Sequence, residues 1–101
     1  MGAGAALMEH LVVDKQVGCF INHDLAGYEV PVHADIPKQD VIFLDEVDPT
    51  MSPMKAKGVG ELGLCGVASA IANAIYNATG ARVRDYPITL DKLLDKLPAR
   101  V

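Results

Sequence analysis

A single carboxylate set among glycines is the feature of this sequence best suited to chemistry. Glu61 follows Gly58 and Gly60 and precedes a long apolar run. Two opposing influences act on an acid in this position: desolvation disfavours its charged form, and the positive end of a following helix favours it. The same placement is also typical of a first-turn acid that only complements the helix dipole. Spacing alone therefore leaves a structural and a catalytic role open.

Two helices are expected after this acid. The run over about 62–79 predicts a buried apolar helix, since Ser69, Asn73 and Asn77 are the only conspicuous polar side chains between Leu64 and Ala78. Gly80 is the expected left-handed residue at its end. Leucines with helical spacing predict a C-terminal amphipathic helix over about 89–97, with Thr89 as its cap and Pro98 as its stop.

The first half of the chain predicts a few short strands. Residues 11–13 and 19–21 indicate a hairpin, and 41–44 predict a buried strand that is too short for a helix. Prolines make 28–37 an extended or irregular stretch. The segment 50–60 lacks periodicity and reads as a loop that delivers Glu61 to the helix. Residues 1–101 thus predict one small α+β module.

Other motifs give weaker signals. Residues 58–63 formally match the dinucleotide-binding pattern G-x-G-x-x-G, but no strand precedes them, and Glu61 would repel a phosphate. Cys19 and Cys65 are expected to be buried packing residues, although Cys65 could line the same pocket as Glu61. The three histidines, His10, His23 and His33, have no spacing that suggests a metal site. Lys55 and Lys57 are interpreted as solvated loop cations, and Arg82 and Arg84 are expected to pair with Asp85 or water.

Composition excludes several classes of protein. A net charge of -4 and a pI near 5.1 provide no cationic field for nucleic acid. The N-terminal residues do not form a signal peptide, and the strongly apolar run falls short of the ~20 residues that cross a bilayer. We therefore expect a soluble chain that binds neither nucleic acid nor membrane and is cytoplasmic by default.

Several stretches together resemble one family. They are residues 56–61 (AKGVGE), 70–80 (AIANAIYNATG), 82–89 (RVRDYPIT), 4–9 (GAALME) and 22–31 (NHDLAGYEVP). The sequence resembles the C-terminal part of the molybdenum-binding subunit in the xanthine dehydrogenase and aldehyde oxidase family. Leu62 and Gly63 stand where eukaryotic purine-oxidising members carry two prolines, so the chain looks most similar to bacterial aldehyde-oxidising members.

The resemblance implies a role for each candidate site residue. Glu61 would be the catalytic base, which takes a proton from a molybdenum-bound hydroxyl as that oxygen attacks a carbon of an aldehyde or N-heterocycle. Gly58 and Gly60 would let the backbone approach the molybdopterin-type cofactor closely. No residue of this chain is expected to bind the metal itself.

The resemblance also implies partners. The family subunit is several times longer, so residues 1–101 would be a C-terminal fragment, inactive alone and binding no cofactor alone. Its partners would be the remainder of the molybdenum subunit and the iron-sulfur and FAD subunits or domains, and a partner could carry it to the periplasm. An alternative is a non-catalytic assembly module that docks a partner subunit through its apolar helix. A fragment should expose an apolar patch and self-associate.

Overall fold

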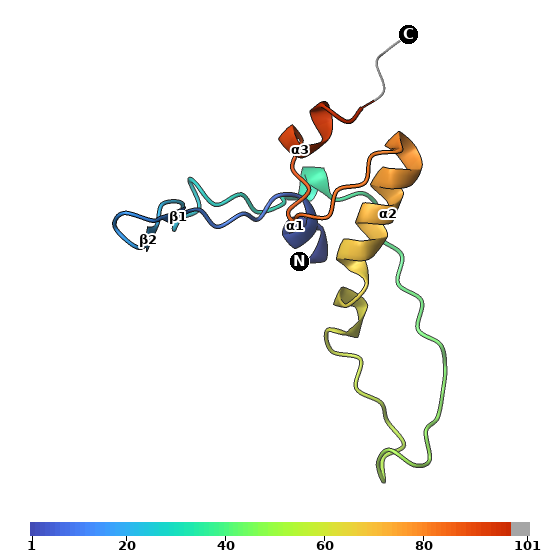
Figure 1. Ribbon diagram of the computed structural model, residues 1–101. Helices are drawn as coiled ribbons and strands as arrows, with labels where there is room; N and C mark the ends of the chain where they lie inside the picture. The colour runs from blue at the N-terminus through green and yellow to red at the C-terminus, as the bar shows by residue number, and fades with distance from the viewer. Residues whose placement is uncertain (98–101) are drawn as a thin grey trace.

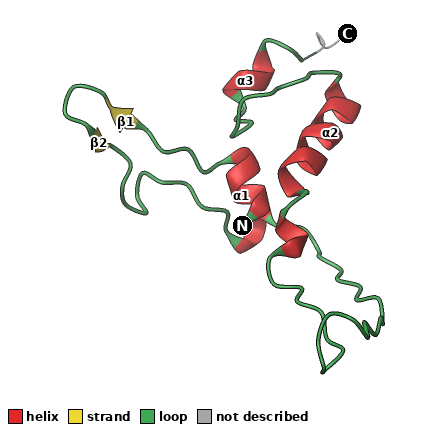
Figure 2. Cartoon of the chain, turned by 60° about the horizontal axis from the view of Figure 1, so that its bottom comes forward, coloured by secondary structure: helices red, strands yellow, loops and turns green. Residues whose placement is uncertain are grey.

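Three segments project from a small helical junction in the computed structural model, which describes residues 1–97 (Figure 1). In chain order the elements are α1 (Gly2–Leu7), β1 (Val13–Asp14), β2 (Cys19–Phe20), the 3-10 helices η1 (His33–Asp35) and η2 (Leu62–Leu64), α2 (Val67–Thr79) and α3 (Asp91–Leu94). The projections are a hairpin arm over residues 10–28, a long loop over 37–61 and the segment that carries α3. Figure 2 shows that the arm and the loop consist almost entirely of irregular chain. The expected α+β class is confirmed.

The junction is held by small apolar residues. Ala72, Val83 and Ile88 form its buried cluster, and the Ile88 N–H donates a 2.6 Å hydrogen bond to the carbonyl of Ala6. α1 and α2 pack closely, since a Cβ at Gly2 would lie only 2.5 Å from Val67 Cγ1. The glycines that weaken α1 as an isolated helix thus permit its packing.

The predicted hairpin is confirmed, with strands of two residues each. Val13 pairs with Phe20 and Asp14 with Cys19 in antiparallel register. Asp14 Oδ1 accepts hydrogen bonds from the backbone N–H groups of Gln16 at 2.7 Å and Val17 at 3.2 Å. Gly18, with φ of 75°, then supplies the left-handed conformation that closes the turn.

The helix predicted over 62–79 forms, but it is interrupted and is not buried. η2 and α2 are separated by a turn, and Gly80 ends α2 in the predicted left-handed conformation, with φ of 72°. Ala72 is the one buried residue of α2. Only the face that meets α1 and residues 81–88 is covered, since the described residues provide no layer for the other face.

Two further expectations need correction. Residues 41–44 form no strand, since no described segment pairs with them, and their side chains are 72–86% exposed. The C-terminal helix is four residues long instead of spanning 89–97, and its N-cap is Leu90 without a side-chain cap bond instead of Thr89. Leu93 reaches the junction, whereas Leu90 and Leu94 remain exposed. The proposed stop at Pro98 lies outside the described residues.

The chain leaves an unusual amount of surface uncovered. Its accessible area is 8699 Å², whereas a folded monomer of 10.7 kDa exposes roughly 5,500 Å². The radius of gyration is 18.6 Å, against roughly 13 Å for an independent domain of this length. The arm and the loop contribute to this difference, because they project away from the junction (Figure 1).

The segment Leu62–Thr79 meets the minimum length and apolar composition of a membrane span. Its α-helical part, however, has 13 residues, which span about 20 Å of a hydrocarbon core that is about 30 Å thick. A helix from the core of a larger protein meets the same criterion. The uncovered face of α2 therefore indicates a protein interface as readily as a lipid-facing surface.

We predict that the 101-residue chain self-associates when it is produced alone. Exposed side chains such as Ile42, Phe43 and Leu44 would find in other copies the apolar cover that this chain lacks. Size-exclusion chromatography with light scattering should give a mass above the 10.7 kDa of one chain. A monomer at all concentrations would contradict this prediction and favour an independent module.

Candidate functional site

Glu61 lies where the long loop returns to the helical junction. It occupies the N-cap position of η2, with φ of -97° and ψ of 19°, and its side chain is exposed. Its carbonyl accepts a 2.9 Å hydrogen bond from the Leu64 N–H. The carboxylate itself does not cap η2, and within residues 1–97 it forms no ion pair. The backbone is thus fixed by η2, while both carboxylate oxygens remain free for another group.

The glycines around Glu61 border open space. Apart from its own neighbours in the sequence, a Cβ at Gly58, Gly60, Gly63 or Gly66 would meet no atom of the described residues within 4 Å. Gly60 has a positive φ of 24°, which accounts for its identity. At Gly58 neither the backbone conformation nor packing inside this chain requires glycine. A missing side chain there leaves room for the close approach of something outside the described residues.

An ion-pair latch joins the two limbs of the loop just before the glycines. Lys57 Nζ lies 2.8 Å from Glu46 Oε1 and 3.7 Å from Asp48 Oδ2. The Asp48 N–H also reaches the Lys55 carbonyl, at 3.4 Å. We refer to Lys57, Glu46 and Asp48 as the latch. The interpretation of Lys57 as a solvated cation is therefore wrong. The signal for this ion pair in the sequence was the presence of acids nine and eleven positions before Lys57.

Asp48 organises the tip of the loop next to the latch. Its Oδ1 accepts hydrogen bonds from the Thr50 hydroxyl at 2.7 Å, the Thr50 N–H at 2.9 Å and the Met51 N–H at 3.2 Å. The hydrogen bonds from Thr50, with those from Met51 and Lys57, hold the pKa of the Asp48 carboxyl below its ordinary 3.8. The loop that carries Glu61 thus contains a small, ordered turn.

The structure does not bring the other candidate residues to Glu61 as a metal or nucleophile site. Within residues 1–97, no group of three His, Cys, Asp or Glu side chains could hold a metal ion. Cys19 and Cys65 are both exposed, so their expected burial is wrong in this chain. Cys65 lies directly after η2, where it is exposed.

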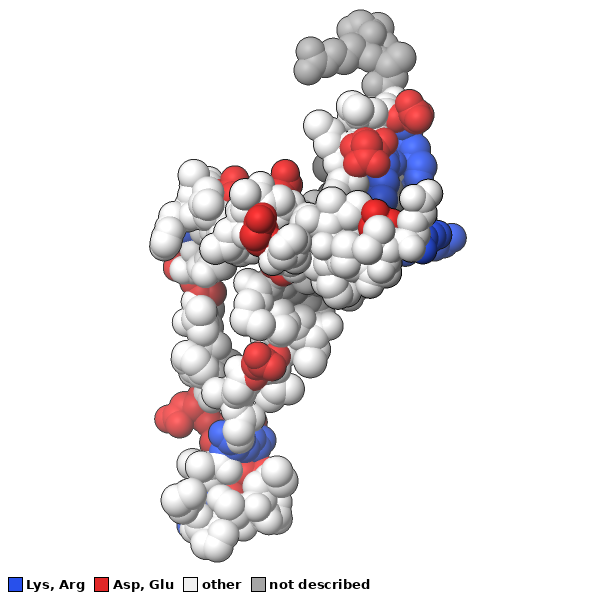
Figure 3. Space-filling view, turned by 90° about the vertical axis from the view of Figure 1, so that its left-hand side faces the viewer, with Lys and Arg blue, Asp and Glu red and all other residues white. Residues whose placement is uncertain are grey.

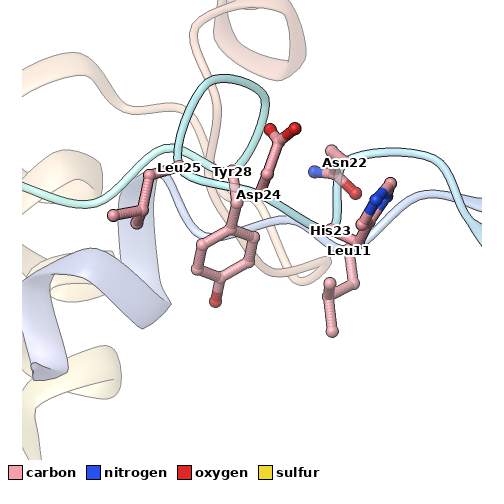
Figure 4. Close-up of a pocket in the computed structure, with 6 residues that line it drawn as sticks. All are labelled: Leu11, Asn22, His23, Asp24, Leu25 and Tyr28. Atoms are coloured by element: carbon pink, nitrogen blue, oxygen red, sulfur yellow. The ribbon is translucent and has the colours of Figure 1, made fainter.

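A separate hollow at the base of the hairpin arm has a structural explanation (Figure 4). Asn22 Oδ1 accepts a 2.8 Å hydrogen bond from the Val12 N–H, which ties the two sides of the arm together. Asp24 Oδ1 accepts from the N–H groups of Ala26 and Gly27. The Tyr28 hydroxyl donates to Glu9 Oε2 at 2.7 Å, and this bond raises the pKa of Tyr28. These polar side chains are used within the arm and contain no reactive arrangement.

Arg82 stabilises the junction. Its Nη1 donates a 2.9 Å hydrogen bond to Asn73 Oδ1, and its guanidinium lies 4.0 Å from the centre of the Tyr76 ring. The pairing with Asp85 or water expected for Arg82 is therefore replaced by a contact with α2, and the Asn73 amide has a structural hydrogen-bond partner. Charged side chains are scattered on the face drawn in Figure 3, and much of that face carries no charge.

Comparison with known proteins gives a consistent result. The chain is 82% identical over 97% of its length to the aldehyde oxidoreductase molybdenum-binding subunit PaoC of Escherichia coli K12. It is 33% identical over 95% of its length to a xanthine dehydrogenase molybdenum-binding subunit of Escherichia coli O157:H7. It is 36% identical over 97% of its length to an aldehyde oxidoreductase of Megalodesulfovibrio gigas. No protein-family model matches the chain.

These similarities confirm the resemblance to molybdenum-binding subunits of the xanthine dehydrogenase and aldehyde oxidase family, and the chain is a segment of this class. It spans 13% of the length of the first two relatives and 10% of the third. The much higher identity to the first relative also confirms the resemblance to the bacterial aldehyde-oxidising members. The catalytic role of Glu61 and the cofactor contacts of Gly58 and Gly60 stay predictions.

We predict a pH-dependent loosening of the loop tip through Asp48. A lowered pKa favours the carboxylate in the folded loop, so its stabilising effect is complete well above pH 3.8 and is lost as the pH falls through the lowered pKa. Amide resonances of Thr50 and Met51 in the 101-residue chain should move together in this acid range. Asp48→Asn should abolish the transition, whereas Asp40→Asn should retain it. Resonances that stay constant through this range would contradict the assignment.

Proposed function

We propose that this chain supplies the general base of a molybdenum hydroxylase, with Glu61 as that base. The substrate class would be aldehydes or N-heterocycles, and water would be the source of the added oxygen. The observation that carries the proposal is the exposed, unpaired carboxylate of Glu61, held by η2 on backbone that borders open space. The similarity to molybdenum-binding subunits supports the same conclusion.

The glycine loop fits a molybdopterin-type cofactor as one wall of its site. Gly58 and Gly60 offer backbone that a flat ligand could approach without meeting a side chain. The described residues contain no cluster of metal ligands, so the groups that hold the cofactor would belong to the rest of the subunit. When bound, the cofactor would supply the oxidising capacity for hydroxylation. This chain alone would bind no cofactor and would be inactive.

Glu61 would act by holding and releasing one proton. A carboxylate without its own hydrogen-bond donors can accept a proton from a nucleophilic oxygen placed within about 3 Å. η2 orients the residue through the hydrogen bond between Leu64 and the Glu61 carbonyl. Positioned bases of this kind contribute about 10²–10⁴-fold to rate.

The proposed partners follow from the size of the relatives. The chain covers 13% of a molybdenum-binding subunit, so its principal partner would be the remainder of that subunit, followed by iron-sulfur and FAD subunits or domains. We place the assembled enzyme in the cytoplasm, or in the periplasm if a partner carries an export signal. The uncovered face of α2 also favours docking of a partner subunit. Docking is the role of the alternative, a non-catalytic assembly module, and it is compatible with the hydroxylase proposal.

We predict that Glu61→Gln abolishes hydroxylation in the complete enzyme. The amide keeps the shape of the side chain and cannot accept the proton, so kcat should fall by about 10²–10⁴-fold while molybdenum content stays unchanged. Steady-state kinetics and elemental analysis would measure both quantities. Glu29→Gln, at an exposed position directly after the hairpin arm, is the matched control. Near-normal turnover of Glu61→Gln would refute the proposed role.

We also predict that Gly58→Ala lowers molybdenum content or activity of the complete enzyme. The added methyl group would meet none of the described residues beyond its sequence neighbours, so a loss would report a group that approaches from outside them. Gly66→Ala is the control, because it has the same open surroundings, an ordinary φ of -101°, and a position after the proposed cofactor loop. Equal behaviour of the two variants would argue against cofactor contact at Gly58.

A further inference from the structure

The outgoing limb of the long loop carries an uncovered apolar segment. Val41, Ile42, Phe43 and Leu44 are 74%, 85%, 72% and 86% exposed. Asp40 precedes this run, and Asp45 and Glu46 follow it. We refer to residues 41–44 as the docking segment. Exposure of four consecutive large apolar side chains is costly in water, so the segment requires a cover that the described residues do not provide.

The composition of the docking segment specifies a strand. Valine, isoleucine and phenylalanine favour extended chain, and four residues are too few for a stable helix. In extended chain Val41 and Phe43 point to one side, and Ile42 and Leu44 to the other. Because both sides are apolar, the pattern is that of a strand buried on both faces.

The backbone of the docking segment is also available. Among residues 1–97 no backbone hydrogen bond involves positions 41–44. Buried N–H and C=O groups need partners, so covering these side chains requires a sheet edge that also pairs the backbone. The acids at both ends of the run would stay in water. They would therefore limit strand pairing to the four apolar residues and so define its register.

We propose that residues 41–44 add as a β-strand to a sheet edge in the remaining part of the molybdenum-binding subunit. This inference rests on the proposed function, because the protein that would supply the sheet edge is the remainder of the subunit proposed there. Almost nine tenths of the first relative's length lies outside the matched segment, which supplies a protein large enough to hold such a sheet. Addition of a strand to an open edge combines backbone hydrogen bonds with side-chain burial.

The strand would also fix the limb that carries Glu61. Lys57 on the returning limb is paired with Glu46, two residues after the docking segment. Figure 1 shows the two limbs meeting at the tip of the loop, from which the returning limb leads to η2. Docking of residues 41–44 therefore anchors one limb, and the latch passes this constraint to the backbone before Gly58.

Hydrogen–deuterium exchange of the complete molybdenum-binding subunit tests the proposal. We expect at least alternate amides of residues 41–44 to exchange 100-fold or more slowly than unstructured chain, in a subunit that is monomeric by light scattering. Phe43→Ala should speed exchange at these amides at least tenfold. Met51→Ala is the matched control, because Met51 is equally exposed, at 70%, but lies outside the apolar run.

Two results would overturn the proposal. Exchange at the rate of unstructured chain would show that no strand forms, and protection that appears only in dimers would assign the edge to a second copy of the chain. Both results are independent of Glu61→Gln: the strand can fail while that variant is inactive, and the base can fail while the strand is protected. The two proposals are therefore tested separately.

Discussion

The structure depends on apolar surface that this chain does not bury with its own residues. Its core consists largely of alanines, with Val83 and Ile88 as the larger members. Fixing the backbone of each residue costs roughly 1–2 kcal/mol in conformational entropy, and the arm and the loop bury too little to offset that cost. Their shapes must therefore be maintained by contacts with other protein. In the proposed function, the rest of a molybdenum-binding subunit would supply those contacts.

The latch illustrates why contacts within the loop are insufficient. Lys57 and Glu46 are 40% and 67% exposed, and an ion pair of this kind contributes at most about 1 kcal/mol. Such an interaction selects how the two limbs meet but does not hold the loop rigid against solvent. Rigidity at Glu61 would arise when the docking segment is covered, because the latch then connects a fixed limb to the limb that carries Glu61.

Local signals in the sequence predicted local structure, whereas burial was predicted poorly. Gly80 ends α2 as expected, and the turn at Gly18 forms, because backbone conformation depends on residues close in sequence. The strand at 41–44 and the burial of Cys65 were expected from hydrophobicity alone. Hydrophobicity indicates which side chains require cover, but residues 1–97 do not cover these positions. The role of Glu61 was predicted from the resemblance to the family and not from spacing. A lone acid at this position often only complements the dipole of the following helix.

The structure also changes which influence on Glu61 should matter most. The sequence placed Glu61 at the mouth of a continuous helix, whose dipole would stabilise the carboxylate. In the structure three residues of η2 and a turn intervene, and α2 begins only at Val67. Because the dipole effect falls off within the first turn of a helix, α2 contributes little at Glu61. The electrostatic effect of α2 that the sequence indicated is therefore weak at Glu61, and the backbone around η2, which borders open space, sets its surroundings instead.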